Sequence, residues 1–172
     1  ASRWITGEAA RARVHADRAR HAAIMVGVGT VLADDPSLTA RPVEAASLLG
    51  VHQPLRVVVD THLRTPLDAQ LVRTAAEAPT CIVTTETDGE AFRALEASGC
   101  RMLTVPERDG RVDLDAAFRA LGEAGVSSVI VEGGPQLLGA VFDAKLADCV
   151  QAYVAPKIFG GAGAPGPVGG TG

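Results

Sequence analysis

Short apolar runs alternate with amphipathic helical patterns along most of this chain, and this alternation limits the possible folds more than any other feature. The runs are rich in branched side chains and nearly continuous, as in strands covered on both faces. They occupy residues 22–28, 55–60, 81–85, 101–105, 127–133 and 150–156. Helical patterns occupy residues 7–22, 89–99, 113–125 and 134–146. The alternation predicts an α/β fold with a mainly parallel sheet flanked by helices.

The pattern at 113–125 is the clearest helix. Its apolar residues recur with helical spacing and form one stripe, at Leu114, Ala117, Phe118 and Leu121. Gly125 is expected to end this helix. In open α/β sheets, ligands bind beyond the carboxyl ends of the strands, so we look for a site there.

No linker or internal repeat divides the 172 residues, and a chain of this length can bury a core without metal or disulfides. We therefore expect a single domain over residues 1–172. The glycine-rich segment 160–172 predicts a flexible loop or tail.

Charge and hydropathy exclude several classes of partner. The formal net charge is −4 and the basic residues form no stripe, so nucleic acid is not an expected partner. No apolar run approaches the roughly 18 residues of a membrane-spanning helix, and no signal peptide is evident. We expect a cytoplasmic protein with no membrane partner.

The spacing of cysteines and histidines predicts no metal site. The cysteines are far apart and show no CxxC spacing, so we expect small buried apolar side chains at Cys81, Cys100 and Cys149. The histidines form no HExxH or HxE arrangement and are scattered, at His15, His21, His52 and His62.

Two glycine-rich turns follow predicted strands, and the first is VGVGTVLADDP at residues 26–36. The strand runs out in glycines, Thr30 offers a hydroxyl group, and Asp34 and Asp35 lie in a predicted turn. These aspartates either cap the turn or accept hydrogen bonds from a ligand.

The second turn lies in VIVEGGPQLL, residues 129–138, where a strand ends in Glu132 and two glycines precede a helix with Pro135 near its start. Backbone amides at such a helix start suit a pyrophosphate. The alternative is a tight turn with no ligand. A carboxylate at the end of an interior strand is costly unless it is paired or used, which favours a functional site.

Several common nucleotide and hydrolase motifs are missing from the sequence. There is no GxGxxG followed by an acidic residue about 20 positions later, which argues against an ordinary Rossmann dehydrogenase. Neither a GxxxxGK[ST] loop nor a GxSxG elbow occurs.

In combination, five blocks resemble the reductase domain of the RibD family of riboflavin-biosynthesis proteins. The resemblance covers nearly the whole chain in the expected order. The blocks are SRWIT (2–6), VGVGTVLADDPSLTAR (26–41), PLRVVVDTHLRTP (54–66), VIVEGGPQLLGA (129–140) and YVAPKIFGG (153–161).

This resemblance implies a dihydrofolate-reductase-like fold in three layers, with NADPH as cofactor. It implies reduction of 5-amino-6-(5-phosphoribosylamino)uracil to the ribitylamino product, with hydride passing to the sugar C1. The protein would mainly position the two ligands. The resemblance also implies a homodimer.

The resemblance assigns ligand contacts but no catalytic residue. Substrate contacts are implied at Ser2, Arg18, Leu38, Arg41 and Glu132, with the two arginines on the sugar phosphate. Cofactor contacts are implied at Trp4, Thr30, Asp34, Thr61, Gly133, Gly134, Pro135, Gln136, Leu137, Leu138, Gly139 and Ala140. Thr61 and Arg64, after the strand at 55–60, are expected to favour NADPH over NADH.

The sequence departs from the family pattern at both ends. It begins without the first strand of the family and stops in the glycine-rich segment before the final strand, so we expect a domain that lacks both. Members of the family often carry a zinc deaminase domain with HxE and PCxxC motifs, and neither motif occurs here.

Two other functions compete with this interpretation. One is an NADPH-dependent reductase of the same fold that acts on a pterin or another substrate, which would not need two arginines for a sugar phosphate. The other is a nucleotide-binding module without turnover, which would bind NADPH but not oxidise it in the presence of substrate.

Overall fold

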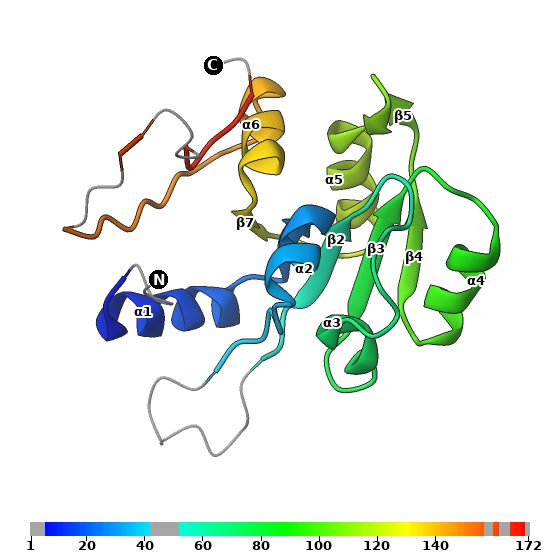
Figure 1. The fold of residues 1–172 in the computed structure, drawn as a ribbon, viewed down its shortest axis with the longest axis horizontal. Coiled ribbons are helices and arrows are strands. Elements are labelled where there is room, and N and C mark those ends of the chain that lie inside the picture. The colour runs from blue at the N-terminus through cyan, green and yellow to red at the C-terminus, as the bar shows by residue number, and fades with distance from the viewer. Residues whose placement is uncertain (1–5, 42–51, 157–159, 162–165, 171–172) are drawn as a thin grey trace.

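A five-stranded parallel sheet forms the centre of the molecule (Figure 1). The computed structural model describes residues 6–41, 52–156, 160–161 and 166–170. The strand order is β4-β3-β2-β1-β7. The strands are β1 (Ala23–Gly27), β2 (Leu55–Val59), β3 (Thr80–Thr84), β4 (Arg101–Thr104) and β7 (Val129–Gly133). Five of the six predicted strands are therefore present, with ends within about two residues of the apolar runs.

Six helices and one small hairpin are present among the described residues. The helices are α1 (Glu8–Arg20), α2 (Val28–Asp34), α3 (Gln70–Arg73), α4 (Glu90–Ala97), α5 (Leu114–Glu123) and α6 (Pro135–Asp143). The hairpin pairs β5 (Glu107–Arg108) with β6 (Arg111–Val112). The four predicted helices are confirmed as α1, α4, α5 and α6. Within the described ranges, no helix has both the length and the apolar character needed to cross a membrane.

The predicted three-layer α/β arrangement is confirmed by two apolar clusters on opposite faces of the sheet. Side chains alternate along a strand, so Ile24 and Val26 of β1 pack with residues of α2, α3 and α4. Ala23 and Met25 pack on the other face with residues of α5 and α6. The predicted stripe on α5 faces this second cluster, and Gly125 follows the helix with a φ of 89°.

The first glycine-rich segment is largely helical, whereas the sequence predicts a turn there. Residues 28–34 form α2, which begins directly after β1, and Asp35 follows in the left-handed conformation with a φ of 39°. Val28 and Val31 of α2 are buried, and their packing against the sheet stabilises a helix in a segment whose glycines favour a loop.

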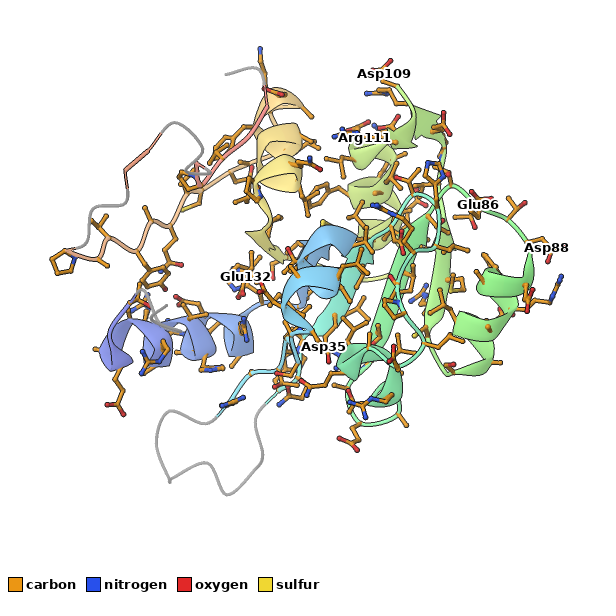
Figure 2. All side chains as sticks on the ribbon, viewed as in Figure 1. Asp35, Glu86, Asp88, Asp109, Arg111 and Glu132 are labelled. Carbon is orange, nitrogen blue, oxygen red and sulfur yellow. The ribbon has the colours of Figure 1, made fainter. Side chains whose placement is uncertain are left out.

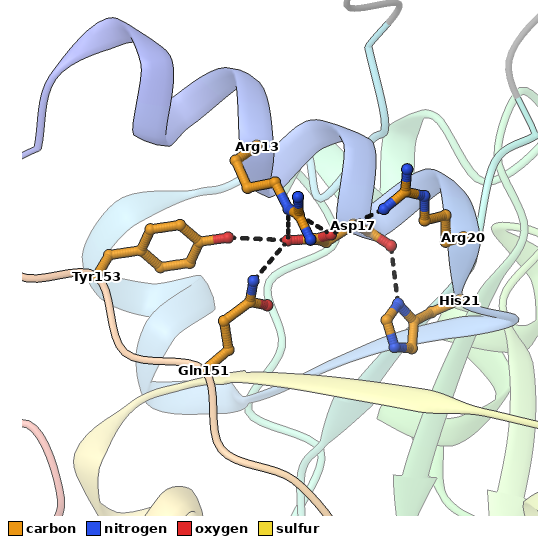
Figure 3. Close-up of polar contacts among 6 residues, drawn as sticks. All are labelled: Arg13, Asp17, Arg20, His21, Gln151 and Tyr153. Atoms are coloured by element: carbon orange, nitrogen blue, oxygen red, sulfur yellow. Dashed lines mark hydrogen bonds and ion pairs between the residues drawn. The ribbon is translucent and has the colours of Figure 1, made fainter.

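The predicted strand at 150–156 is wrong. The chain there is irregular, and Val150 and Val154 are exposed by 65% and 91%. Instead of pairing with the free edge of β7, this segment contacts α1. The Gln151 amide and the Tyr153 hydroxyl each donate to Oδ2 of Asp17, at 2.9 Å (Figure 3). An apolar run becomes a strand only when a neighbouring strand satisfies its backbone, and the segment does not reach one.

Asp17 is the centre of this contact, and its side chain is almost fully buried. Arg13 donates to both carboxylate oxygens, at 3.0 and 3.1 Å (Figure 3). Burial raises the pKa of Asp17, but the hydrogen bonds from Tyr153, Gln151 and Arg13 outweigh burial and leave the pKa below 3.8. The network therefore stabilises the folded state only while Asp17 is ionised.

We predict a pH-dependent stability difference between the wild type and Asp17→Asn. Because the pKa of Asp17 is lowered by folding, the variant should be less stable by about 1–2 kcal/mol at neutral pH. The difference should stay constant well above pH 3.8 and shrink as the pH falls below that value. Urea unfolding at a series of pH values measures it, and a difference independent of pH would contradict the prediction.

The end of the glycine-rich segment is packed rather than free. The Gly169 amide donates to the Pro135 carbonyl at 2.9 Å. A Cβ atom at Gly139 would lie 2.3 Å from the Gly169 backbone, so only glycine allows this approach of the chain to α6. The prediction of a flexible tail is therefore wrong for residues 169–170.

The cysteines follow the predicted burial in part. Cys81 and Cys100 are buried, and burial raises the pKa of Cys81 to about 11. Cys149 is exposed, against the prediction, because it lies in the irregular segment after α6.

Candidate functional site

The two glycine-rich turns meet at the carboxyl edge of the sheet. β1 and β7 are neighbouring parallel strands, so the segments that follow them emerge side by side. A Cβ atom at Gly134 would lie 3.5 Å from Oγ1 of Thr30, which shows how closely α2 approaches the second turn. The fold thus brings together two segments that are about a hundred residues apart in the sequence.

The turn from β7 to α6 has the features of an anion-binding helix start. Gly133 has a φ of 121°, which favours glycine, and the Gly133–Gly134 peptide is cis. Gly134 is the N-cap of α6 and gives no side-chain cap, and Pro135 occupies the first turn. Backbone amides of the first turn are therefore available to an anionic group, which the helix dipole also favours.

Glu132 lies at an irregularity in β7. Met25 of β1 pairs with Val131, but the next residue, Val26, pairs with Gly133, so Glu132 is left out of the register. A bulge of this kind redirects a side chain. The bulge directly precedes the glycine turn. The Glu132 carboxylate lies beside the end of α1 (Figure 2).

Arg18 of α1 holds Glu132 in a two-pronged ion pair. Nε of Arg18 donates to Oε1 at 2.7 Å and Nη2 donates to Oε2 at 2.5 Å. Nη1 donates to the Thr39 carbonyl at 3.2 Å, which ties the segment after α2 to the same pair. The side chains are only 15% and 19% exposed, so solvent screens this pair weakly. Further N–H groups on Nη1 and Nη2 remain for a ligand.

Arg41 and His15 lie close to this pair. Arg41 is exposed, and its side chain has no hydrogen-bond or ion-pair partner within the described ranges. Burial lowers the pKa of His15, and the charges of Arg18 and Arg41 lower it further, against smaller opposite effects of the Thr39 backbone and Glu132. Positive charge thus accumulates here around a single carboxylate.

A second concave region lies at the other end of the carboxyl edge. Residues 85–87, after β3, and 104–107, at and beyond the end of β4, line a cavity of about 540 Å³. Thr61 borders it, because its carbonyl accepts hydrogen bonds from the hydroxyl groups of Thr84 and Thr85 at 2.9 and 3.0 Å. The Thr61 hydroxyl accepts from the Val112 amide at 3.3 Å.

The remaining predicted contacts have varied surroundings. Asp34 is exposed at the end of α2, whereas its neighbour Asp35 accepts a hydrogen bond from the backbone N–H of Gln70 at 2.7 Å. Leu38 is 2% exposed and belongs to the core. In α6, Gln136 is exposed and Leu137 is 8% exposed. Leu138, Gly139 and Ala140 continue the helix, and the predicted contacts Ser2 and Trp4 lie outside the described residues.

Sequence reasoning missed three features of the site: His15, the bulge at Glu132, and the cavity after β3 and β4. The threonines and glutamates at and just beyond the ends of the runs at 81–85 and 101–105 could have indicated the cavity. His15 belongs to no motif, and of the two arginines that affect it, Arg41 is brought near it only by the fold.

Known proteins resemble this chain over nearly its whole length. The model of the RibD C-terminal domain matches residues 1–172. The riboflavin biosynthesis protein RibD of Actinobacillus pleuropneumoniae is 44% identical over 171 residues, which cover 99% of this chain and 44% of the relative. RibD of Bacillus amyloliquefaciens is 40% identical, with the same two coverages.

Solved structures show the same fold. A diaminohydroxyphosphoribosylaminopyrimidine deaminase/5-amino-6-(5-phosphoribosylamino)uracil reductase from Thermotoga maritima matches with a TM-score of 0.64 and 27% identity, over 83% of this chain and 36% of that chain. RibD of Acinetobacter baumannii matches with a TM-score of 0.68 and 24% identity, over 94% of this chain and 45% of that chain, and supports the fold alone.

The chain spans less than half the length of the curated relatives that it matches, and the match covers all of its own residues. Since the family model and relatives of about 40% identity agree, this chain belongs to the RibD C-terminal domain family.

Proposed function

We propose that this protein reduces 5-amino-6-(5-phosphoribosylamino)uracil to the ribitylamino product with NADPH. The observation that carries the proposal is the Arg18–Glu132 pair, positioned by a bulge beside the glycine turn at the start of α6. An anion-binding helix start and a cationic cluster around one carboxylate suit two anionic ligands that meet at this edge.

The residues at the carboxyl edge fit the proposed cofactor. The pyrophosphate would lie against the amides of the turn at Gly133 and Gly134, and Thr30 adds a hydroxyl group beside that turn. Thr61, with Arg64 exposed nearby, would hold the 2′-phosphate. When bound, NADPH supplies the hydride that passes to C1 of the opened sugar.

The cationic cluster fits the phosphate of the proposed substrate. Arg41 is exposed and offers a planar fork of N–H donors, and Arg18 has N–H groups left over from its contacts to Glu132 and Thr39. The Glu132 carboxylate can accept hydrogen bonds from substrate hydroxyl or amino groups. These side chains bind and orient the substrate, so most of the catalytic effect comes from positioning.

Two further properties belong to the proposal as implied by the family. We propose that the protein forms a homodimer, which light scattering on the purified protein measures. Because one structural relative is named as a deaminase as well as a reductase, the protein is also proposed to work beside a deaminase domain.

The loss of NADPH absorbance in the presence of the ribotide tests the proposed function. We expect turnover with the ribotide, and much lower catalytic efficiency with NADH. Turnover with a pterin but not the ribotide would favour the competing reductase. NADPH binding without oxidation in the presence of either substrate would favour a binding module.

We predict that Arg41→Lys weakens the use of substrate but not of cofactor. Lysine keeps the charge and loses the fork, so the KM for the ribotide should rise about tenfold, while the Kd of NADPH stays unchanged. Steady-state kinetics and a separate NADPH titration measure the two values. Arg64→Lys is the matched control, because we expect it to affect NADPH and not the ribotide. An unchanged KM in Arg41→Lys would remove the phosphate assignment.

A further inference from the structure

His15 is a polar residue of this site whose hydrogen bonding is incomplete. It lies on α1, one turn before Arg18, and is half-buried. Its Nδ1 atom is buried and has no hydrogen-bond partner among the described residues. Buried polar atoms are normally paired, so an unpaired ring nitrogen beside a cationic cluster indicates that a ligand completes the site.

An anion bound beside His15 would reverse the net electrostatic effect of the neighbouring charges on the ring. Arg18 on the same helix and Arg41 after α2 lie close enough to lower the pKa of the ring, whereas a hydrogen bond with the Thr39 backbone and the charge of Glu132 on β7 raise it. Burial and the two arginines lower the pKa of His15, so the free protein holds a neutral imidazole at neutral pH. A doubly charged anion beside Arg41 would oppose both effects of the arginines and favour the protonated ring.

We propose that His15 binds the anionic group of the substrate together with Arg41, and that it takes up one proton from solvent as that anion binds. The neutral ring gains the proton, and the resulting imidazolium donates an N–H to an oxygen of the anion. The proposal rests on the proposed function only in placing a phosphate at Arg41. It makes His15 a binding residue that senses whether the phosphate is present.

Proton uptake on binding of inorganic sulfate tests the proposal without turnover. Sulfate remains a dianion near neutral pH, so any proton taken up enters the protein. Calorimetry in two buffers of different ionisation enthalpy should show uptake of up to one proton by the wild type. His15→Gln, which can still donate a hydrogen bond but does not titrate, should bind sulfate without uptake.

His21→Gln is the matched control. His21 follows the same helix, and its Nδ1 lies 2.8 Å from the Asp17 carbonyl oxygen, so its ring already has a partner. This variant should keep the proton uptake of the wild type. Sulfate binding by the wild type with no proton uptake, uptake that persists in His15→Gln, or no sulfate binding at all would each overturn the proposal.

Kinetics with the ribotide separate this proposal from the proposed function. His15→Ala should raise the KM for the ribotide about tenfold and leave the KM for NADPH unchanged. The wild-type KM should rise with pH as the bound imidazolium loses its proton, whereas His15→Gln should show a flatter profile. If the wild type turns over the ribotide and His15→Ala and His15→Gln have the same KM as the wild type, the role of His15 is refuted and the proposed function stands. Absence of turnover with proton uptake on sulfate would refute the proposed function alone.

Discussion

Replacing Arg56 by alanine is expected to lower the free energy of unfolding by about 4–5 kcal/mol. Arg56 is on β2 and is fully buried, and its guanidinium lies between β2, α3 and the segment after α2. It donates to the carbonyls of Ser37, Leu71, Thr74 and Ala78 and to the Thr74 hydroxyl, at distances from 2.5 to 3.2 Å.

The size of this effect follows from what the substitution leaves behind. Four carbonyl groups and one hydroxyl group lose a hydrogen bond at once, although the Leu71 and Thr74 carbonyls keep other donors, and the volume of the side chain becomes a cavity. Removal of the buried positive charge recovers part of the loss, because burial lowers the pKa of Arg56 and so disfavours its charged form. The free energy lost with the hydrogen bonds and the cavity exceeds the cost of burying one charge, so the net change should remain a large destabilisation.

Urea unfolding of Arg56→Ala, compared with Arg73→Ala, measures this effect. Arg73 lies on α3 close to Arg56 in the fold but is exposed, so its removal should change stability by less than about 0.5 kcal/mol. A loss below about 1 kcal/mol in Arg56→Ala would mean that its hydrogen bonds only balance the cost of burying the charge.

Arg56 also illustrates why the sequence predicts the sheet better than the connections. The runs that form β1, β2 and β3 are nearly continuous and apolar, so their pattern alone indicates buried strands. Arg56 is a charged residue within its run, but the strand still forms. The short helix α3 has only four residues and is held in part by carbonyl contacts to Arg56. No local pattern reports such a contact, because it comes from another strand.

The site was predictable in its parts and not in its assembly. The glycine turn before α6 could be recognised from residues 129–138, because two glycines and a proline before an apolar helical pattern indicate a turn and a helix start from local sequence alone. The Arg18–Glu132 pair joins residues 114 positions apart, and the bulge at Glu132 depends on how β7 pairs with β1. Pairing between strands is a property of the whole sheet, so neither feature could be derived from a single segment.

The Arg18–Glu132 pair leads to the second large effect. Arg18→Ala should lower the free energy of unfolding by about 2–3 kcal/mol, because it leaves a poorly exposed carboxylate without its counter-charge. The value is below that for a fully buried pair, since both side chains keep some contact with solvent. Arg20→Ala is the control on the same helix: its side chain is 67% exposed, and it should cost less than about 0.5 kcal/mol.

A double-mutant cycle isolates the pair from other contacts of Arg18. Glu132→Gln alone leaves the guanidinium with a neutral partner, and Arg18→Ala alone leaves the carboxylate unpaired. The double variant Arg18→Ala/Glu132→Gln should therefore lose about 1–3 kcal/mol less than the sum of the two single losses. Additive losses within about 0.5 kcal/mol would show that the two side chains do not depend on each other.

The same variants separate a structural pair from a pair that also binds substrate. If Arg18 and Glu132 only connect α1 to β7, the folded double variant should use the ribotide about as well as the wild type does. We expect instead that its KM for the ribotide rises at least about tenfold, because the charged donor and acceptor for the substrate are both lost. NADPH affinity should be retained, since the turn at Gly133 and Gly134, where we propose that the cofactor binds, would use backbone amides that these substitutions leave in place. A normal KM for the ribotide in the folded double variant would confine the pair to a structural role and leave Arg41 and His15 as the anion-binding groups of the site.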